Sequence, residues 1–193
     1  MTSIDLGSIV RLFARALEDW DARAPQASSS RTGALYAPGV GPFAEAMTVA
    51  TVAHEMARNL SIPVGTGVSY PSAARRKCDL VVDDWHMEVK LLRMLGDNGK
   101  PNDNMVMHLL SPYSVHRSAL TDCAKLRDSG FRGRKAVLVY AFDYDDLPAE
   151  PALRAFEVLA SDNGPMGGRV SATFKSPTHP IHSRGVVCGW EVL

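Results

Sequence analysis

The chain has 193 residues, of which 46% are hydrophobic and 22% are charged. This composition is typical of a folded globular protein and excludes a disordered one, and the length suits one domain. The 21 Lys and Arg residues balance the 21 Asp and Glu residues, which excludes a uniformly basic nucleic-acid coat protein. A polyanionic partner would therefore have to meet a local basic patch.

The sequence predicts a cytoplasmic protein without a membrane segment. No apolar run approaches the roughly 20 residues that span a bilayer, and Met1–Ser8 lacks the basic start of a signal peptide. The cysteines are odd in number and widely spaced, which favours a reducing compartment over a disulfide framework. They are Cys78, Cys123 and Cys188.

Helical and extended patterns alternate along the chain. In chain order we expect a helix at 4–22, a Ser- and Gly-rich arm at 24–42, a helix at 42–60 with Pro42 in its first turn, extended segments at 63–70 and 78–92, a polar loop at 96–104, a helix at 114–129 with Val115 among its apolar positions, a strand at 135–142, a helix near 151–160, and strands near 169–174 and 185–192. This order predicts a mixed α/β fold in a single domain.

The most informative segment is a predicted hairpin from Lys77 to Leu92, KCDLVVDDWHMEVKLL. A two-residue turn at Asp83-Asp84 would place Val82 opposite Trp85. Alternation then gathers apolar side chains on one face, namely Cys78, Leu80, Val82, Trp85, Met87, Val89 and Leu91. The other face collects Lys77, Asp79, Val81, His86, Glu88 and Lys90.

In this register Asp79 lies opposite Glu88, with Cβ atoms roughly 4.5–5.5 Å apart. Two carboxylates this close repel each other unless a cation or a proton lies between them. Mg²⁺ takes such oxygen ligands, and Lys90 on the same face could steady a scissile phosphate or orient an attacking water. The alternative is an amphipathic hairpin with a solvated charged face, and the residues alone leave both interpretations open.

The order of helix, Asp-bearing strand, Glu-x-Lys strand, helix and strand resembles the PD-(D/E)xK nuclease superfamily, which includes restriction endonucleases and Holliday junction resolvases. The resemblance covers about 41–143, and Cys78 stands where the family pattern has Pro. It implies a restriction-endonuclease-like core, a mixed β-sheet flanked by helices, with an N-terminal helix and arm at 1–40 and additions at 144–193. It also implies Mg²⁺, or Mn²⁺ as a substitute, held by Asp79, Glu88 and the Val89 carbonyl, with Lys90 as the catalytic lysine.

Many members of this superfamily add an acidic residue from the preceding helix. On a helical wheel for 43–60, Glu45 falls inside the apolar arc and Glu55 falls outside it. The resemblance therefore favours Glu45 as a further catalytic acid, with Glu55 in reserve. A simple interaction of Glu45 with the helix dipole in the first turn fits equally well.

Basic residues precede two of the predicted strands. The candidates for phosphate contact are Arg75, Arg76 and Lys77. A second cluster of the same kind is Arg132, Arg134 and Lys135, and weaker candidates are His116 and Arg117. A solvated loop is the commoner role of such runs, so their importance depends on the nuclease interpretation.

Histidines offer a further pattern. His179, His182 and Cys188 could suggest zinc, but the Pro-flanked HPIH segment lacks a fourth ligand at a recognisable spacing. Structural loop histidines are the preferred interpretation. His86 shares a face with Asp79 and Glu88 and is interpreted as a surface partner.

Together with these residues, the resemblance thus implies a Mg²⁺-dependent endonuclease that hydrolyses phosphodiester bonds of double-stranded DNA as a homodimer. Restriction, phage defence and repair are the roles open to such an enzyme. One alternative is a nuclease-like module that binds nucleic acid or a partner protein without cleaving. Another is an unrelated α/β domain whose hairpin carries no chemistry.

Overall fold

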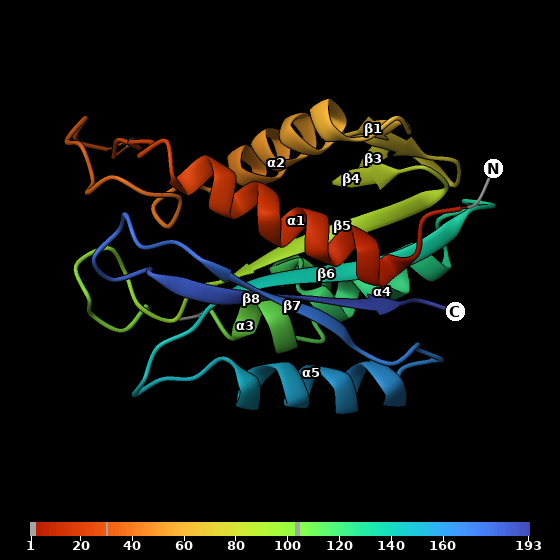
Figure 1. The fold of residues 1–193 in the computed structure, drawn as a ribbon. Coiled ribbons are helices and arrows are strands. Elements are labelled where there is room, and N and C mark those ends of the chain that lie inside the picture. Colours follow the sequence, from red (N-terminus) through yellow and green to blue (C-terminus); the bar gives the residue numbers. More distant parts are fainter. Residues whose placement is uncertain (1–2, 30, 103–104) are drawn as a thin grey trace.

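A computed structural model describes residues 3–29, 31–102 and 105–193, and its central element is a six-stranded sheet between two layers of helices (Figure 1). The strand order is β1-β4-β5-β6-β8-β7, with β5 and β6 parallel and the other neighbours antiparallel. The strands are β1 Val64–Gly65, β4 Leu80–Val82, β5 Trp85–Leu92, β6 Arg134–Phe142, β7 Val170–Lys175 and β8 Arg184–Glu191. The predicted α/β class with a mixed sheet flanked by helices is confirmed.

Helices cover both faces of this sheet (Figure 1). On one face lie α1 (Leu6–Asp21) and α2 (Glu45–Asn59); on the other lie α3 (Met107–Leu110), α4 (Ala119–Arg127) and α5 (Glu150–Asp162). The first helix begins after Asp5, whose carboxylate accepts the Ser8 N–H at 2.8 Å. Its apolar residues recur at helical spacing and pack on the sheet; they include Ile9, Phe13, Leu17 and Trp20.

The predicted hairpin and its register are confirmed. Val82 pairs with Trp85 and Leu80 with Met87, and Asp83 has a φ of 56°, a left-handed conformation that Asp tolerates better than most residues. The same register, continued by one residue, places Asp79 opposite Glu88. The hairpin therefore delivers the two carboxylates side by side.

The predicted alternation of faces holds from Leu80 to Leu91 and is wrong for Cys78. Odd-numbered side chains of β5 pack against α1 and α2, whereas Cys78 packs in the opposite core cluster with Tyr70. The reason is a bend at Asp79, which separates β4 from β3 (Ala73–Cys78). β3 pairs instead with β2 (Val68–Tyr70) in a separate two-stranded sheet.

Two predicted helices have different bounds. The helix expected at 114–129 is split into a 3₁₀ turn, Ser114–His116, and α4, because Arg117 adopts a left-handed φ of 48°. The Ser118 hydroxyl then accepts the Thr121 N–H and starts α4, and Val115 is 79% exposed rather than in the core. The helix expected from Pro42 begins at Glu45, after a turn at 41–43.

Three further expectations concern the segment at 63–70, membrane-spanning helices and the cysteines. The extended segment predicted at 63–70, which turn residues interrupt, forms two short strands, β1 and β2. In the part of the chain that the structure describes, no helix is long and apolar enough to cross a membrane. All three cysteines are free and buried.

Candidate active site

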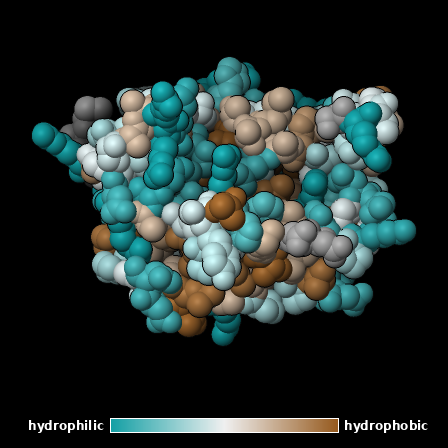
Figure 2. Space-filling view, turned by 180° about the vertical axis from the view of Figure 1, so that it is seen from behind, coloured by the Kyte–Doolittle hydropathy of each residue, from teal (hydrophilic) through white to brown (hydrophobic). Residues whose placement is uncertain are grey.

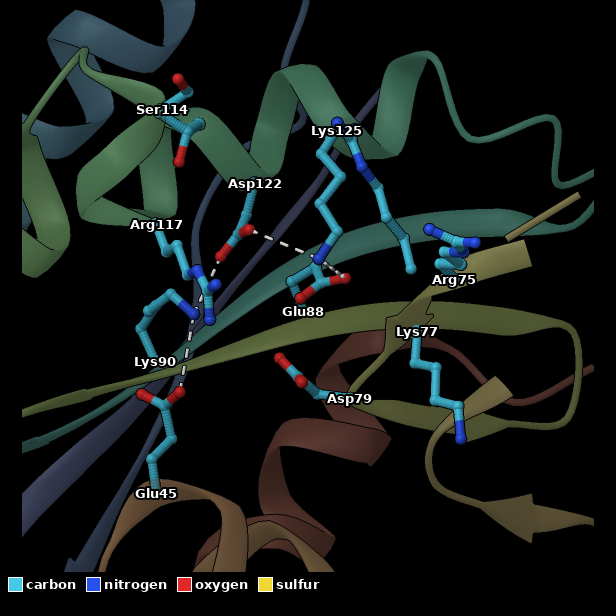
Figure 3. Close-up of a pocket in the computed structure, with 12 residues that line it drawn as sticks. Glu45, Arg75, Lys77, Asp79, Glu88, Lys90, Ser114, Arg117, Asp122 and Lys125 are labelled. Atoms are coloured by element: carbon cyan, nitrogen blue, oxygen red, sulfur yellow. Dashed lines mark ion pairs between the residues drawn. The ribbon is translucent and has the colours of Figure 1, made fainter. Parts of the chain in front are cut away.

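A cavity of about 600 Å³ lies between β3, β5, α4 and the start of α2 (Figure 3). It gathers the side chains that the sequence proposed for catalysis and phosphate contact, together with four that it did not. The lining residues are Glu45, Arg75, Arg76, Lys77, Asp79, Glu88, Lys90, Ser114, Arg117, Thr121, Asp122 and Lys125.

Glu88 lies deepest among these groups, with 1% of its surface exposed. Its Oε1 accepts a hydrogen bond from the Tyr70 hydroxyl and lies 2.6 Å from the Lys125 ammonium. Burial, followed by the charges of Asp122 and Asp79, raises the pKa of Glu88 to about 8. Glu88 therefore has a high affinity for a proton, chiefly because it is buried and then because Asp122 and Asp79 lie near it.

Lys90 is held by carboxylates on both sides. Its Nζ lies 2.9 Å from Asp122 Oδ2 and 3.5 Å from Glu45 Oε1, and it donates to the Val89 carbonyl at 3.2 Å (Figure 3). Burial disfavours its charge, but the charges of Asp122 and Glu45 outweigh burial and raise its pKa above the usual range. Lys90 is therefore a fixed positive charge at neutral pH.

Asp79 and Glu45 connect neighbouring elements to β5 through its backbone. Asp79 Oδ2 accepts the Val89 N–H at 2.9 Å, and Glu45 Oε2 accepts the Leu91 N–H at 2.7 Å. Burial raises the pKa of Glu45 despite the nearby Lys90. Glu55 lies far along α2 and pairs with Arg23 at 2.9 Å, so Glu45 is the acid that reaches the cavity.

The solvated-face interpretation of the hairpin is wrong for its two central groups. Lys90 is 9% exposed and Glu88 only 1%, because α4 covers this face of β5. His86 stacks on Phe131 with ring centroids 3.9 Å apart and does not line the cavity. These two groups belong to a buried set of paired charges and not to a solvated surface.

Sequence reasoning missed Asp122 and Lys125 on α4, and Tyr70 on β2. A usable signal existed for the first: Asp122 follows Ala119 by three residues and precedes Leu126 by four, so it lies on the core-facing stripe of the helix. Lys125 lies 3.7 Å from Asp122, one turn along α4. No local pattern indicates Tyr70, because its contact with Glu88 depends on how β2 packs and not on the residues around it in the sequence.

The basic residues divide into two groups. Arg75, Arg76 and Lys77 are exposed on β3, a strand rather than the expected loop, and Figure 3 shows the Lys77 side chain extending away from the carboxylates.

Figure 2 shows the opposite face of the molecule from Figure 1, where hydrophilic side chains gather beside a hollow and hydrophobic ones along the edge over α5.

The second basic cluster lies elsewhere. Arg134 pairs with Glu191 at 3.0 Å and covers the Trp85 ring at 3.9 Å, so it supports β6 rather than the cavity. Of the weaker candidates, Arg117 lines the cavity, whereas His116 lies 2.6 Å from the Ser111 hydroxyl.

No protein-family model, curated protein or solved structure matches this chain. The geometry of the cavity is therefore the basis for the proposal that follows.

Proposed function

We propose that this chain is a divalent-metal-dependent endonuclease that hydrolyses phosphodiester bonds of double-stranded DNA. We further propose that its hairpin, α2, α4 and β6 form a restriction-endonuclease-like core of the PD-(D/E)xK type. The observation that carries the proposal is the convergence of Asp79, Glu88 and Lys90 at one cavity. Exposed cations beside that cavity suit a polyanionic substrate.

The donor groups fit a hard cation such as Mg²⁺, with Mn²⁺ as a substitute. Asp79 and Glu88 would supply carboxylate oxygens and Val89 its carbonyl. Burial and then the charges of Asp122 and Asp79 raise the pKa of Glu88, and a bound cation would favour its ionised form. When bound, such an ion polarises the phosphate and lowers the pKa of a bound water.

The chain's own residues would then have distinct tasks. Lys90, fixed by Asp122 and Glu45, stabilises negative charge that develops on the phosphate oxygens. Tyr70 and Lys125 orient Glu88 from two other elements. Phosphates farther along the substrate would contact the rim cations Arg75, Arg76, Lys77 and Arg117.

The test is cleavage of supercoiled plasmid and duplex oligonucleotides with Mg²⁺, Mn²⁺ or EDTA. We expect metal-dependent cutting that is lost in Asp79→Asn and in Lys90→Met. The matched controls are Asp146→Asn and Lys100→Met, which change exposed residues outside the cavity and should cut normally.

Other results would redirect the assignment. Retained cutting in both site variants would refute the assignment of this cavity. Metal binding without cutting, lost in Asp79→Asn, would favour a nucleic-acid or protein-binding module. Two copies of the site could cut the two strands of a duplex together, so by analogy with the PD-(D/E)xK superfamily we also propose a homodimer, to be checked by sedimentation of the protein with and without DNA.

A further inference from the structure

A second cluster of metal-ligating side chains lies apart from the cavity, where the segment after β5 meets the loop between β7 and β8. Asp97, His179 and His182 each offer one ligand atom, and these atoms all lie within 4.8 Å of one another. Both histidines are fully buried, and their rings stack with centroids 4.6 Å apart. The sequence favours a structural role for these histidines over a zinc site with Cys188, and Cys188 packs in the core cluster beneath α5.

The N-terminal arm packs directly against these two histidines, because it has glycines at the points of contact. Gly39 has a φ of 121°, and a Cβ added there would lie 2.7 Å from the His179 Cβ. Gly41 is pressed against the His182 ring in the same way. Three segments distant in sequence therefore close around the cluster: the arm, the segment after β5, and the β7–β8 loop.

His182 already has the neighbours of a metal-bound histidine. Its Nε2 lies 3.0 Å from Asp97 Oδ1, and its Nδ1 lies 2.9 Å from the Tyr144 hydroxyl. Without an ion, the Nε2 proton faces the Asp97 carboxylate and Nδ1 accepts from the Tyr144 hydroxyl. When an ion takes the place of the Nε2 proton, the proton moves to Nδ1 and the same hydroxyl can accept it, which orients the ring as a ligand. Asp97 supplies the anionic ligand and, at 19% side-chain exposure, an access route from solvent.

His179 carries an unused polar atom. Among the residues that the structure describes, its buried Nε2 has no hydrogen-bond partner. A buried polar atom without a partner costs about 1–3 kcal/mol. An ion that takes this nitrogen as a ligand would give it a partner, in exchange for the two long hydrogen bonds that Nδ1 now accepts.

We propose that Asp97, His179 and His182 form a site for a transition-metal ion of the Zn²⁺ class, with water as the remaining ligand. Two imidazoles and one carboxylate suit Zn²⁺ or Co²⁺, whereas Mg²⁺ prefers oxygen donors alone. The site is separate from the catalytic cavity and does not depend on the nuclease proposal. A bound ion would stabilise the contacts of the β7–β8 loop with the arm and with the segment after β5.

Binding requires local adjustments at both histidines and at Arg93, and the first is the loss of the His182 Nε2 proton that faces Asp97. The His179 Nδ1 now accepts the N–H groups of Ile181 and His182, both at 3.2 Å, so its proton is on Nε2. Ligation moves that proton to Nδ1 and releases these two long hydrogen bonds. Arg93, now 3.2 Å from Asp97 Oδ1, keeps its second contact with the Gly41 carbonyl.

The experiment is Co²⁺ titration of EDTA-treated protein followed by visible absorption, in a background of Asp79→Asn so that the catalytic carboxylates contribute little. We expect d–d bands that saturate at one ion per chain, and binding at least about tenfold weaker in Asp97→Asn, His182→Gln and Tyr144→Phe. The matched control is His54→Gln, an exposed histidine on α2, which should bind as before.

Circular dichroism of each variant shows whether it is folded before cobalt is added. Unchanged binding in folded Asp97→Asn and His182→Gln would overturn the proposal, as would the absence of bands in the folded parent. If the variants do not fold, anomalous diffraction from wild-type crystals soaked in Zn²⁺ decides the matter. A peak between Asp97 and His182 is expected, and a peak elsewhere or none would refute the site. Loss of DNA cleavage in Asp79→Asn leaves this result untouched, so the two proposals fail separately.

Discussion

The raised pKa of Glu88 predicts that Glu88→Gln changes how stability depends on pH. Without metal, the folded protein keeps a proton on Glu88 up to about pH 8, whereas the ordinary pKa of this carboxyl is 4.5. Between those values the folded state binds more protons than the unfolded state, so the free energy of unfolding falls as the pH rises. Glutamine is neutral throughout and removes this contribution.

The size of the effect follows from the same two values. One pKa unit is worth about 1.4 kcal/mol, so the interval from 4.5 to about 8 sets an upper bound of about 5 kcal/mol. We therefore expect wild type and Glu88→Gln to be similar in stability at pH 5. Near pH 8.5 in EDTA the variant should be the more stable of the two.

The assay is urea unfolding from pH 5 to pH 9, with EDTA or with Mg²⁺. The control is Glu191→Gln, which removes a partly exposed carboxylate paired with Arg134 outside the cavity. Its free energy of unfolding should change with pH as that of wild type does. Mg²⁺ at a hundred times its dissociation constant should add about 2.7 kcal/mol to wild type at high pH and little to Glu88→Gln. If the free energies of unfolding of wild type and Glu88→Gln change with pH in the same way across this range, Glu88 is not the buried carboxyl with a raised pKa that the cavity implies.

Three further substitutions test other parts of the structure. Lys90→Met removes the ammonium group that lies 2.9 Å from the buried Asp122 and should lower the free energy of unfolding, measured in urea, by about 3 kcal/mol. Most of this loss should be recovered when Asp122→Asn is added, and no recovery would contradict the pairing. Ser118→Ala removes the N-cap of α4 and should cost about 1 kcal/mol, measured in the same way. Arg75→Ala should weaken DNA binding and lower its salt dependence by about one unit of slope, and an unchanged slope would place the DNA elsewhere.

The hairpin could be predicted because its information is local. Its turn, its alternation and the spacing between Asp79 and Glu88 lie within one short segment, and the structure reproduces this register. Cys78 departs from the pattern because β3 pairs with β2, a contact that alternation within β4 and β5 does not encode. The break at Arg117 depends on one left-handed residue followed by a capping Ser118, and apolar spacing alone does not reveal it.

Contacts between distant segments could not be derived in the same way. Lys125 reaches Glu88 only because α4 lies across β5, and that placement depends on the packing of the whole core rather than on α4 itself. The same holds for Asp97, which lies more than 80 residues before the two histidines that it approaches. Spacing rules for metal sites detect ligands that are close in sequence, so they reject this arrangement.

Charge balance connects the inner and outer parts of the cavity. If all were ionised, its four carboxylates, Glu45, Asp79, Glu88 and Asp122, would exceed its two inner ammonium groups, Lys90 and Lys125, by two negative charges. Without metal, the proton held by Glu88 reduces this excess, and one divalent cation would cancel it. The rim has the opposite character, since Arg75, Arg76, Lys77 and Arg117 add four positive charges. A cation for the interior and a polyanion for the rim are the two ligands that this distribution favours, and a metal-dependent nuclease binds both together.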